Sequence, residues 1–144
     1  MSVKITNKSK HPLPQYETKG SSGMDIRANL ENQIIIPSLG RVLVKTGLFL
    51  EMEHGLECQV RPRSGLAIKR GITVLNSPGT IDADYRGEVG VILINLSHED
   101  VEIQDGERIA QLVFCKIEQV EFVQVDVLSD SERGSGGFGS TGVN

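Results

Sequence analysis

Short runs of Val, Ile and Leu recur along nearly the whole chain, and turn-forming residues separate them. Such runs, closed by Gly, Pro, Asn or Asp, are typical of strands rather than helices. We predict strands over residues 3–6, 24–28, 33–36, 41–45, 48–52, 57–61, 72–75, 89–96, 101–103, 108–117 and 121–125. Many short strands with regular turns indicate an antiparallel all-β domain, a distorted jelly-roll or β-barrel.

The length and composition restrict the class of protein. A chain of 144 residues fits one domain, since domains commonly have about 100–150 residues. No apolar run approaches the ~20 residues that span a bilayer, and the N-terminus lacks the apolar core of a secretion signal. We therefore expect a cytoplasmic protein that does not bind a membrane. The net charge of −4 argues against a nucleic-acid partner, because such partners normally require a basic face.

The cysteines and histidines show no pattern typical of a metal site. Cys58 and Cys115 each lie inside a predicted strand, so we expect two reduced, buried side chains. His11, His54 and His98 are scattered and lack ligand spacing with the cysteines, which makes a zinc site improbable. We interpret all three histidines as residues of surface loops.

One helix is predicted, over residues 64–70, with Ser64 as its candidate N-cap. Basic residues gather around this segment, at Arg61, Arg63, Lys69 and Arg70. In an acidic protein, one local basic cluster suits a small anion better than a charged polymer. A solvated basic face explains the same pattern equally well.

The segment 76–87 combines turn-forming residues with several polar groups. It contains the carboxylates Asp82 and Asp84, and Tyr85 follows directly. A predicted strand comes next, and loops held by stiff β scaffolds commonly carry recognition and catalysis. A hairpin with solvated charges is the plainer interpretation of the same residues.

The composition changes near residue 129, and we divide the chain into a β domain, 1–128, and a flexible C-terminal arm, 129–144. Residues 134–139 fit the dinucleotide pattern GxGxxG, and 134–141 nearly fit a phosphate-binding loop. Both interpretations fail, because each motif needs a strand before it and a helix after it. Phe138 is an unusual residue for such an arm: either it is tolerated there, or it is a stacking lid that orders over a ligand.

Five segments together resemble the homotrimeric, all-β dUTPase family along nearly the whole chain. They are SGMDIRA at 22–28, RPRSGLA at 61–67, NSPGTIDADYRGEV at 76–89, GERIAQL at 106–112 and RGSGGFGSTG at 133–142. One such segment alone is a weak signal, whereas five in the family's order are a specific one.

The resemblance implies hydrolysis of dUTP to dUMP and pyrophosphate by water attack at the α-phosphorus. This activity keeps uracil out of DNA and supplies dUMP for dTMP synthesis. By similarity, Asp82 is the general base, and Gln111 lies beside the phosphates or the attacking water. Asp84, two residues after Asp82, is expected on the other face of a strand and in a structural role. Mg²⁺ is expected on the triphosphate without a direct protein ligand, with Asp25 as a support of its water shell.

The resemblance also assigns residues to the substrate. Tyr85 is expected under the deoxyribose, where a 2′-hydroxyl would clash, although a core tyrosine is the alternative. Arg108 is interpreted as a structural ion pair. Uracil is expected to be read by Asn76, otherwise an ordinary turn residue, and by the backbone around Thr80, Ile81 and Gly90. The phosphates are expected to contact Arg63, Ser64 and Gly65. In the arm, Arg133 is expected at the γ-phosphate and Phe138 on uracil, with Gly139 and Ser140 as phosphate donors.

Three other functions remain open at this point. A dCTP deaminase uses the same fold but must activate water at a ring carbon, which the pattern of Asp82, Tyr85 and the glycine-rich arm fits less well. A trimer that binds dUTP without hydrolysis has no use for a water-orienting carboxylate. A lectin-like or coat-like jelly roll is the third alternative.

Overall fold

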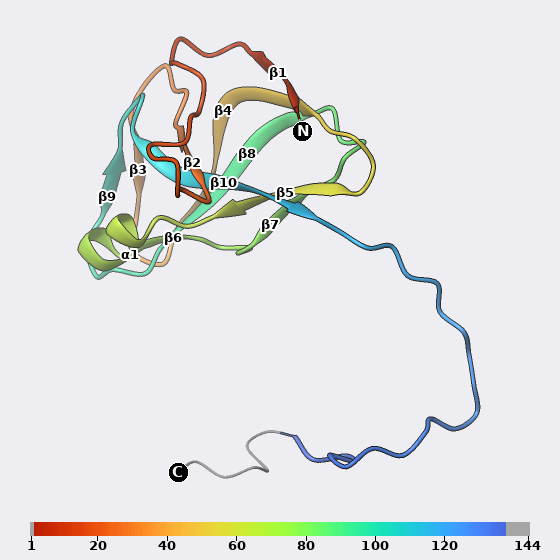
Figure 1. The fold of residues 1–144 in the computed structure, drawn as a ribbon. Coiled ribbons are helices and arrows are strands. Elements are labelled where there is room, and N and C mark those ends of the chain that lie inside the picture. Colours follow the sequence, from red (N-terminus) through yellow and green to blue (C-terminus); the bar gives the residue numbers. More distant parts are fainter. Residues whose placement is uncertain (1, 138–144) are drawn as a thin grey trace.

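The computed structural model describes residues 2–137 and is almost entirely built of strands (Figure 1). The strands are β1 (Lys4–Asn7), β2 (Met24–Arg27), β3 (Ile34–Ile36), β4 (Arg41–Glu51), β5 (Leu56–Arg61), β6 (Ile72–Val74), β7 (Gly79–Ile81), β8 (Glu88–Asn95), β9 (Val101–Ile103) and β10 (Arg108–Lys116). The single helix among the described residues is α1 (Ser64–Arg70). The predicted all-β class and the helix bounds are both confirmed.

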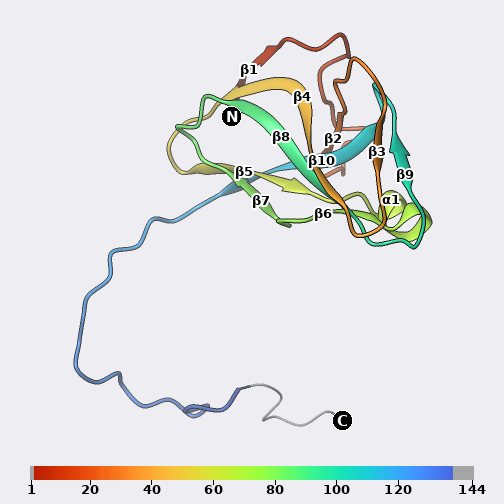
Figure 2. The ribbon, with the colours of Figure 1, turned by 180° about the vertical axis from the view of Figure 1, so that it is seen from behind.

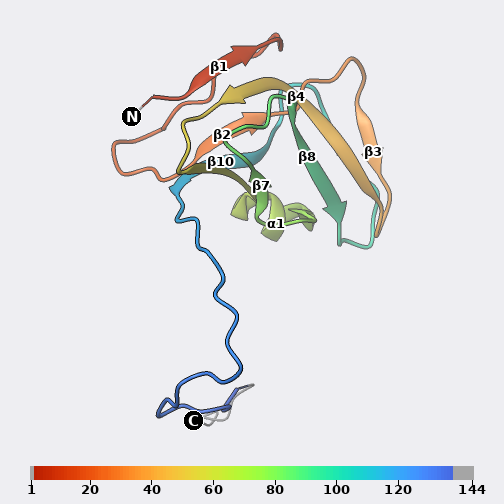
Figure 3. The same ribbon diagram turned by 90° about the vertical axis from the view of Figure 1, so that its right-hand side faces the viewer.

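Two four-stranded antiparallel sheets form the body of the fold. Their strand orders are β1-β4-β8-β6 and β2-β10-β5-β7, and β3 and β9 form a separate pair. In Figure 3, β8 lies on one side of the molecule, and β2 and β10 lie on the other. This arrangement confirms the jelly-roll expectation, and the sheets keep free edge strands rather than closing into a barrel.

The core follows from the alternation of side chains along each strand. In β5, Leu56, Cys58 and Val60 are buried, whereas the residues between them face outward. In β8 the same alternation buries Val89, Val91 and Leu93 on one face of the strand. Alternate residues of a strand point to opposite faces, so each sheet contributes one apolar face to a shared core.

Helix α1 differs in one detail from the prediction. Arg63, with φ −98° and ψ 125°, occupies the N-cap position, and Ser64 is the first helical residue. The expectation that Ser64 is the N-cap is therefore wrong. Gly71 ends the helix in the left-handed region at φ 65°, and its N–H donates to the carbonyl of Ala67. A glycine adopts this conformation without the steric cost of a side chain.

Most predicted strands agree with the structure to within a residue at each end, and the larger differences lie in three places. The strands predicted over 41–45 and 48–52 form one strand, β4, which ends at Glu51 and has an irregular register between Lys45 and Phe49, where Gly47 adopts φ 70°. Strand β7 lies inside the segment predicted as a turn. The strand predicted over 121–125 is wrong, because no described strand pairs with it. Its side chains are left in solvent, and Phe122 is 96% exposed.

Beyond β10 the chain leaves both sheets and runs away from the body of the fold, as two opposite views show (Figures 1 and 2). Residues 117–137 form no strand or helix, apart from turns near residues 132–135. The division of the chain at residue 129 stays a prediction. Among residues 2–137, no helix has the length and hydrophobicity that crossing a lipid bilayer requires.

Candidate functional site

Asp25 lies between two arginines, and these three residues form what we call the arginine cluster. Arg63 Nε donates to Asp25 Oδ1 at 2.9 Å, and Arg108 Nη1 lies 3.2 Å from Asp25 Oδ2. Arg63 also donates to the carbonyl of Arg108 at 3.0 Å. The interpretation of Arg108 as an ion pair is confirmed. One carboxylate thus faces two guanidinium groups, and Glu17 Oε1 lies 3.6 Å from Arg108 Nη1 at the edge of the cluster.

Three sequence-distant segments meet at this cluster because of strand pairing. Asp25 belongs to β2, Arg108 begins β10, and Arg63 follows the last residue of β5. In the sheet, Gln111 of β10 pairs with Asp25 on one side and with Arg61 on the other. The sheet order β2-β10-β5 therefore brings three of the motifs together.

Gln111 is held in one orientation beside the arginine cluster. Its Nε2 donates to the carbonyl of Pro62 at 2.9 Å. On the other side, a Cβ placed on Gly23 would overlap the Gln111 Oε1 atom, so only glycine leaves room for the amide there. The hydrogen bond to Pro62 identifies Nε2 as the end of the amide that faces Pro62, and the absence of a side chain at Gly23 leaves room for Oε1.

Ser64 and Gly65 are exposed at the start of α1, directly after Arg63. The carbonyl of Arg63 accepts the N–H groups of Leu66 and Ala67. The N–H groups of the first residues of an α-helix have no hydrogen-bond acceptor within the helix, so they suit an anion. The structure thus places all three predicted phosphate contacts side by side.

Two other residues of the basic segment predicted from the sequence, Arg61 and Arg70, have partners outside the arginine cluster. Arg70 pairs with the carboxylate of Glu107 and also donates to the carbonyl of Glu102. Arg61 donates to Gln59 Oε1. These residues therefore have structural partners, and Arg63 is the member of the cluster that joins Asp25.

The Asp82 carboxylate is exposed and follows the last residue of β7. Tyr85 N–H donates to the Asp82 carbonyl at 3.1 Å, so residues 82–85 form a turn. The parity argument that separated Asp84 from Asp82 is wrong, because it assumed a strand where the chain turns. Both carboxylates are exposed, and Arg86 fixes the turn by donating to the carbonyls of Ala83 and Tyr85 at 2.7 and 3.0 Å.

Tyr85 is not a core residue, since 47% of it is exposed. Its hydroxyl donates to the carbonyl of Glu88 at 3.3 Å, which ties the ring to the start of β8. The aromatic ring therefore lies at the surface, next in the chain to the turn that presents Asp82.

The residues expected to read uracil lie mostly on β7 and in the turn before it. Strand β7 is an edge strand that pairs only with β5 among the described strands, and Thr80 on it is exposed. Asn76 precedes it in the connecting turn, and a Cβ on Gly79 would lie 3.2 Å from Asn76 Nδ2. The free edge of such a strand presents backbone N–H and C=O groups. Gly90 lies elsewhere, in β8 of the other sheet, where a Cβ would lie 2.7 Å from Leu43 Cδ1.

The turn at Asp82 and the arginine cluster lie at opposite ends of one sheet. Ile81 pairs with Cys58, so the next residue, Asp82, comes level with Glu57 near the start of β5. Gln111 pairs with Arg61, the last residue of β5. At ~3.4 Å per residue, these two places on β5 are roughly 13 Å apart along the strand. One chain therefore does not bring Asp82 and Gln111 together.

Arg133 is the one predicted residue of the arm that the structure describes, and it is not brought to either group. Arg133 belongs to the segment beyond β10, is exposed, and donates from Nε to the carbonyl of Gly136 at 2.8 Å. The predicted residues Phe138, Gly139 and Ser140 lie outside the described residues.

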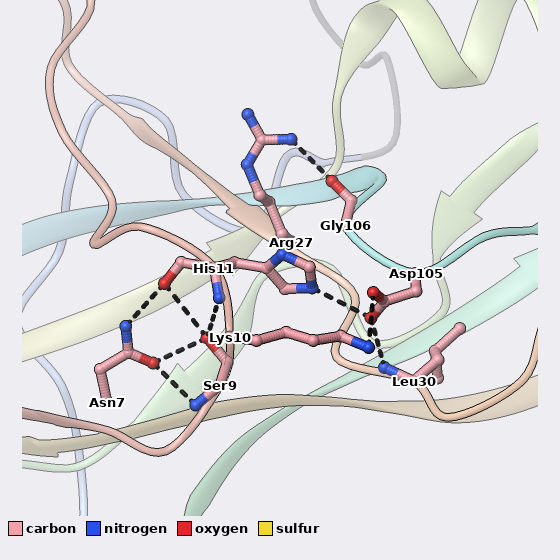
Figure 4. Close-up of polar contacts among 8 residues, drawn as sticks. All are labelled: Asn7, Ser9, Lys10, His11, Arg27, Leu30, Asp105 and Gly106. Carbon is pink, nitrogen blue, oxygen red and sulfur yellow. Dashed lines mark hydrogen bonds and ion pairs between the residues drawn. The ribbon is translucent and has the colours of Figure 1, made fainter.

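A second polar cluster, which the sequence did not predict, fixes the turn before β10 (Figure 4). Asp105 accepts the N–H of Leu30 at 2.9 Å and contacts His11 Nε2 and Lys10 Nζ, each at 3.0 Å. The backbone hydrogen bond from Leu30, then those from His11 and Lys10, hold the pKa of Asp105 well below its usual range. His11 lies in the loop between β1 and β2, as predicted, and its side chain is partly covered, at 16% exposure. Nothing in the local sequence pairs residues so distant.

The two cysteines are free thiols in different surroundings. Cys58 is fully buried, as predicted, and burial raises the pKa of its thiol to about 12. Cys115 is only partly buried. The cysteines, the histidines and the acidic residues form no group of three that could hold a metal ion within residues 2–137.

Comparison with known proteins places the chain in a family. A family model described as dUTPase matches residues 9–142. A deoxyuridine 5′-triphosphate nucleotidohydrolase of Cytophaga hutchinsonii is 60% identical, over 98% of this chain and 92% of that protein. One of Fusobacterium nucleatum is 57% identical, over 97% and 96%. The solved dUTPase of Staphylococcus bacteriophage 80alpha with dUPNHPP has a TM-score of 0.86 at 28% identity, with 99% of each chain covered. The chain belongs to the dUTPase family.

Proposed function

We propose that this chain hydrolyses dUTP to dUMP and pyrophosphate, with water attacking the α-phosphorus. The likeness to named deoxyuridine 5′-triphosphate nucleotidohydrolases over nearly the whole chain carries this proposal. The reaction removes a precursor that would place uracil in DNA and supplies dUMP for dTMP synthesis. A cytoplasmic location fits this role, and two free cysteines suit a reducing compartment.

Asp82 is proposed as the general base that orients and deprotonates the attacking water. Its carboxylate is exposed, and the turn that carries it is fixed by the Tyr85 N–H and by the Arg86 guanidinium. Attack on phosphorus is resisted by the negative charge of the triphosphate. A positioned nucleophile and neutralised charge therefore supply most of the rate enhancement.

Arg63, Ser64 and Gly65 are proposed to bind the phosphates, with Gln111 beside the phosphates or the water. Arg63 is oriented by Asp25, so its guanidinium is presented in one direction. The Gln111 amide is already fixed by Pro62 and Gly23. Groups that do not reorganise during the reaction stabilise developing charge most effectively.

Asn76 and the free edge of β7 at Thr80 and Ile81 are proposed to read uracil, with the backbone of Gly90. Uracil presents acceptor, donor and acceptor along its edge, and cytosine reverses part of that pattern. Fixed backbone groups discriminate against cytosine by leaving a buried polar group unpaired. The ring of Tyr85 is proposed to lie under the deoxyribose.

Mg²⁺ is proposed to enter with the triphosphate. The site fits this arrangement, because both oxygens of Asp25 are engaged by Arg63 and Arg108. Phosphate oxygens and waters suit a cation that dehydrates reluctantly. When bound, the ion neutralises phosphate charge, and Asp25 is proposed to support its water shell only from outside.

A homotrimer is proposed to complete the site. The places of Asp82 and Gln111 lie roughly 13 Å apart along β5, and we infer that the two groups meet one substrate from different copies. The segment after β10 supports association, since it alternates polar residues with the exposed Val123, Val125 and Val127. A segment with this alternation suits a sheet edge of another copy, where it would gain the strand partner that it lacks among the described residues.

The arm, residues 129–144, is proposed to close over the site of a neighbouring subunit. Its start lies beyond a segment that already runs away from its own sheets (Figure 1). In that closed state Arg133 would contact the γ-phosphate and Phe138 would stack on uracil, with Gly139 and Ser140 as phosphate donors. The remaining residues, 1–128, would form the β domain.

Isotope transfer and substrate choice test this proposal. The full chain with Mg²⁺ is incubated with dUTP, dCTP, dTTP or UTP, and pyrophosphate and ammonia are measured. We expect turnover of dUTP alone and no ammonia from dCTP. In ¹⁸O-labelled water the label should enter dUMP, whereas label in pyrophosphate would refute attack at the α-phosphorus.

A further inference from the structure

We propose that Gly87 is a specificity-determining residue, because its missing side chain sets the position of the Tyr85 ring against the sugar. This inference rests on the proposed function, in which Tyr85 excludes a 2′-hydroxyl. Gly87 acts through Tyr85 and is therefore a positioning residue.

The ring of Tyr85 lies directly on the backbone of Gly87. A Cβ placed on Gly87 would overlap the hydroxyl and the Cζ atom of Tyr85, and it would lie 2.8 Å from Cε2. Ordinary contacts of a Cβ begin at 3.4 Å. Any side chain at residue 87 would therefore displace the ring.

The backbone itself does not require glycine at this position. Gly47, Gly55, Gly71 and Gly106 have positive φ angles between 65° and 87°, whereas Gly87 does not. Residues with a side chain readily adopt a backbone without a positive φ, as at residue 87. A glycine at residue 87 is thus explained by the space that the Tyr85 ring occupies.

The ring has one further contact, with Glu88, which is itself held in place by β4. Its hydroxyl donates to the Glu88 carbonyl at 3.3 Å, and Glu88 Oε1 accepts the N–H of Gly47 at 2.8 Å. Glu88 also pairs with Phe49 in the β4–β8 ladder. Gly87 lies against the hydroxyl end of the ring, and 47% of Tyr85 remains exposed. This exposed part would meet the sugar.

The Tyr85 ring can exclude the 2′-hydroxyl of a ribose only if the ring keeps its position when a ribonucleotide enters the site. In Gly87→Ala the ring leaves its contact with the backbone and its hydrogen bond to Glu88. We expect the ratio of kcat/KM for dUTP to kcat/KM for UTP to fall about tenfold or more, the range typical of small steric differences. The KM for dUTP should rise while kcat changes less, because Asp82 is not displaced.

The experiment is a double-mutant cycle between Gly87→Ala and Tyr85→Ala, with both substrates assayed on the full chain. If Gly87 acts only through the ring, its effect on the ratio should vanish in the Tyr85→Ala background. Gly20→Ala is the matched control, because a Cβ there meets nothing within 4 Å. It should leave the ratio unchanged.

Folding is followed in every variant by thermal unfolding. If Gly87→Ala alone fails to fold, the double variant should fold, since its methyl group meets no ring. An unchanged ratio in folded Gly87→Ala, or an equal effect of Gly87→Ala with and without the ring, would overturn the inference. Failure of the unmodified chain to hydrolyse dUTP would instead overturn the proposed function.

Discussion

Replacing Asp25 by Asn tests whether the arginine cluster orients Arg63 for the phosphates. The substitution keeps the shape of the side chain but removes the charge that faces two guanidinium groups, at 2.9 and 3.2 Å. The side chains of Asp25 and Arg63 are 22% and 26% exposed, so solvent screens this interaction only in part. We expect the cluster to lose part of its order rather than its fold.

The magnitude follows from the partial burial. Hydrogen bonds to charged groups contribute about 1.5–3 kcal/mol, whereas fully exposed ion pairs contribute about 0–1 kcal/mol. For a partly buried pair we expect a loss of about 1–2 kcal/mol in the free energy of unfolding. In a chain of this size, this loss corresponds to a Tm lower by about 3–8 °C.

Calorimetry and steady-state kinetics on the same preparation measure both consequences. Besides the lower Tm, the KM for dUTP should rise, because Arg63 is no longer held toward the phosphates. Because Asp25 is proposed to support the water shell of the ion only from outside, the Mg²⁺ concentration for half-maximal activity should rise by a smaller factor than the KM for dUTP. Glu17→Gln is the matched control, since Glu17 lies 3.6 Å from Arg108 and its side chain is 63% exposed. An equal loss of stability in both variants, or an unchanged KM for dUTP in Asp25→Asn, would refute the reasoning.

Four further outcomes are expected. Asp82→Asn should lower kcat by about 10²–10⁴-fold while the Kd of a non-hydrolysable dUTP analogue stays similar, and a small effect on kcat would remove Asp82 as the base. Because hydrogen bonds from a backbone N–H and flanking side chains lower the pKa of Asp105, its contribution to stability is present above the ordinary Asp pKa of about 4 and is lost as the pH falls below it. In urea unfolding between pH 2 and 7, the free energy of unfolding of Asp105→Asn should therefore fall less steeply toward low pH than that of the unmodified chain. The Cys58 thiol, with a pKa of about 12, should react with a thiol reagent only after unfolding, and Cys115→Ser should abolish the reaction of the native chain. Truncation after Asp130 should leave a folded protein with a low kcat, and full activity would exclude the arm from the mechanism.

Local patterns were sufficient to predict most of the fold. Short β-branched runs identified nearly all strands, and the bounds of α1 agree with the prediction. Strand β7 was missed because Gly79 and Thr80 follow turn residues, and only its pairing with β5 makes this segment a strand. The opposite error occurred at 121–125, where alternation indicates a strand but no described strand supplies a partner.

The chemistry of the site was predictable from the motifs, but the partners of each residue were not. Asp25 was expected near the water shell of the metal, and the structure shows its two carboxylate oxygens paired with Arg63 and Arg108. The contact between His11 and Asp105 joins residues 94 positions apart, which no local pattern contains. The role of Gly87 likewise depends on where the Tyr85 ring lies.

The sheet β2-β10-β5-β7 explains why folding and activity should be separable in this protein. Its inner face is buried within one chain, so a single copy already has a continuous apolar core. Its two ends carry different parts of the proposed chemistry, the arginine cluster at one end and the Asp82 turn at the other. A rigid sheet cannot bend to bring its own ends together, because its ladder of hydrogen bonds fixes their separation. A lone chain should therefore fold, whereas the proposed assembly of copies would place the proposed base, the phosphate-binding groups and the arm around one dUTP.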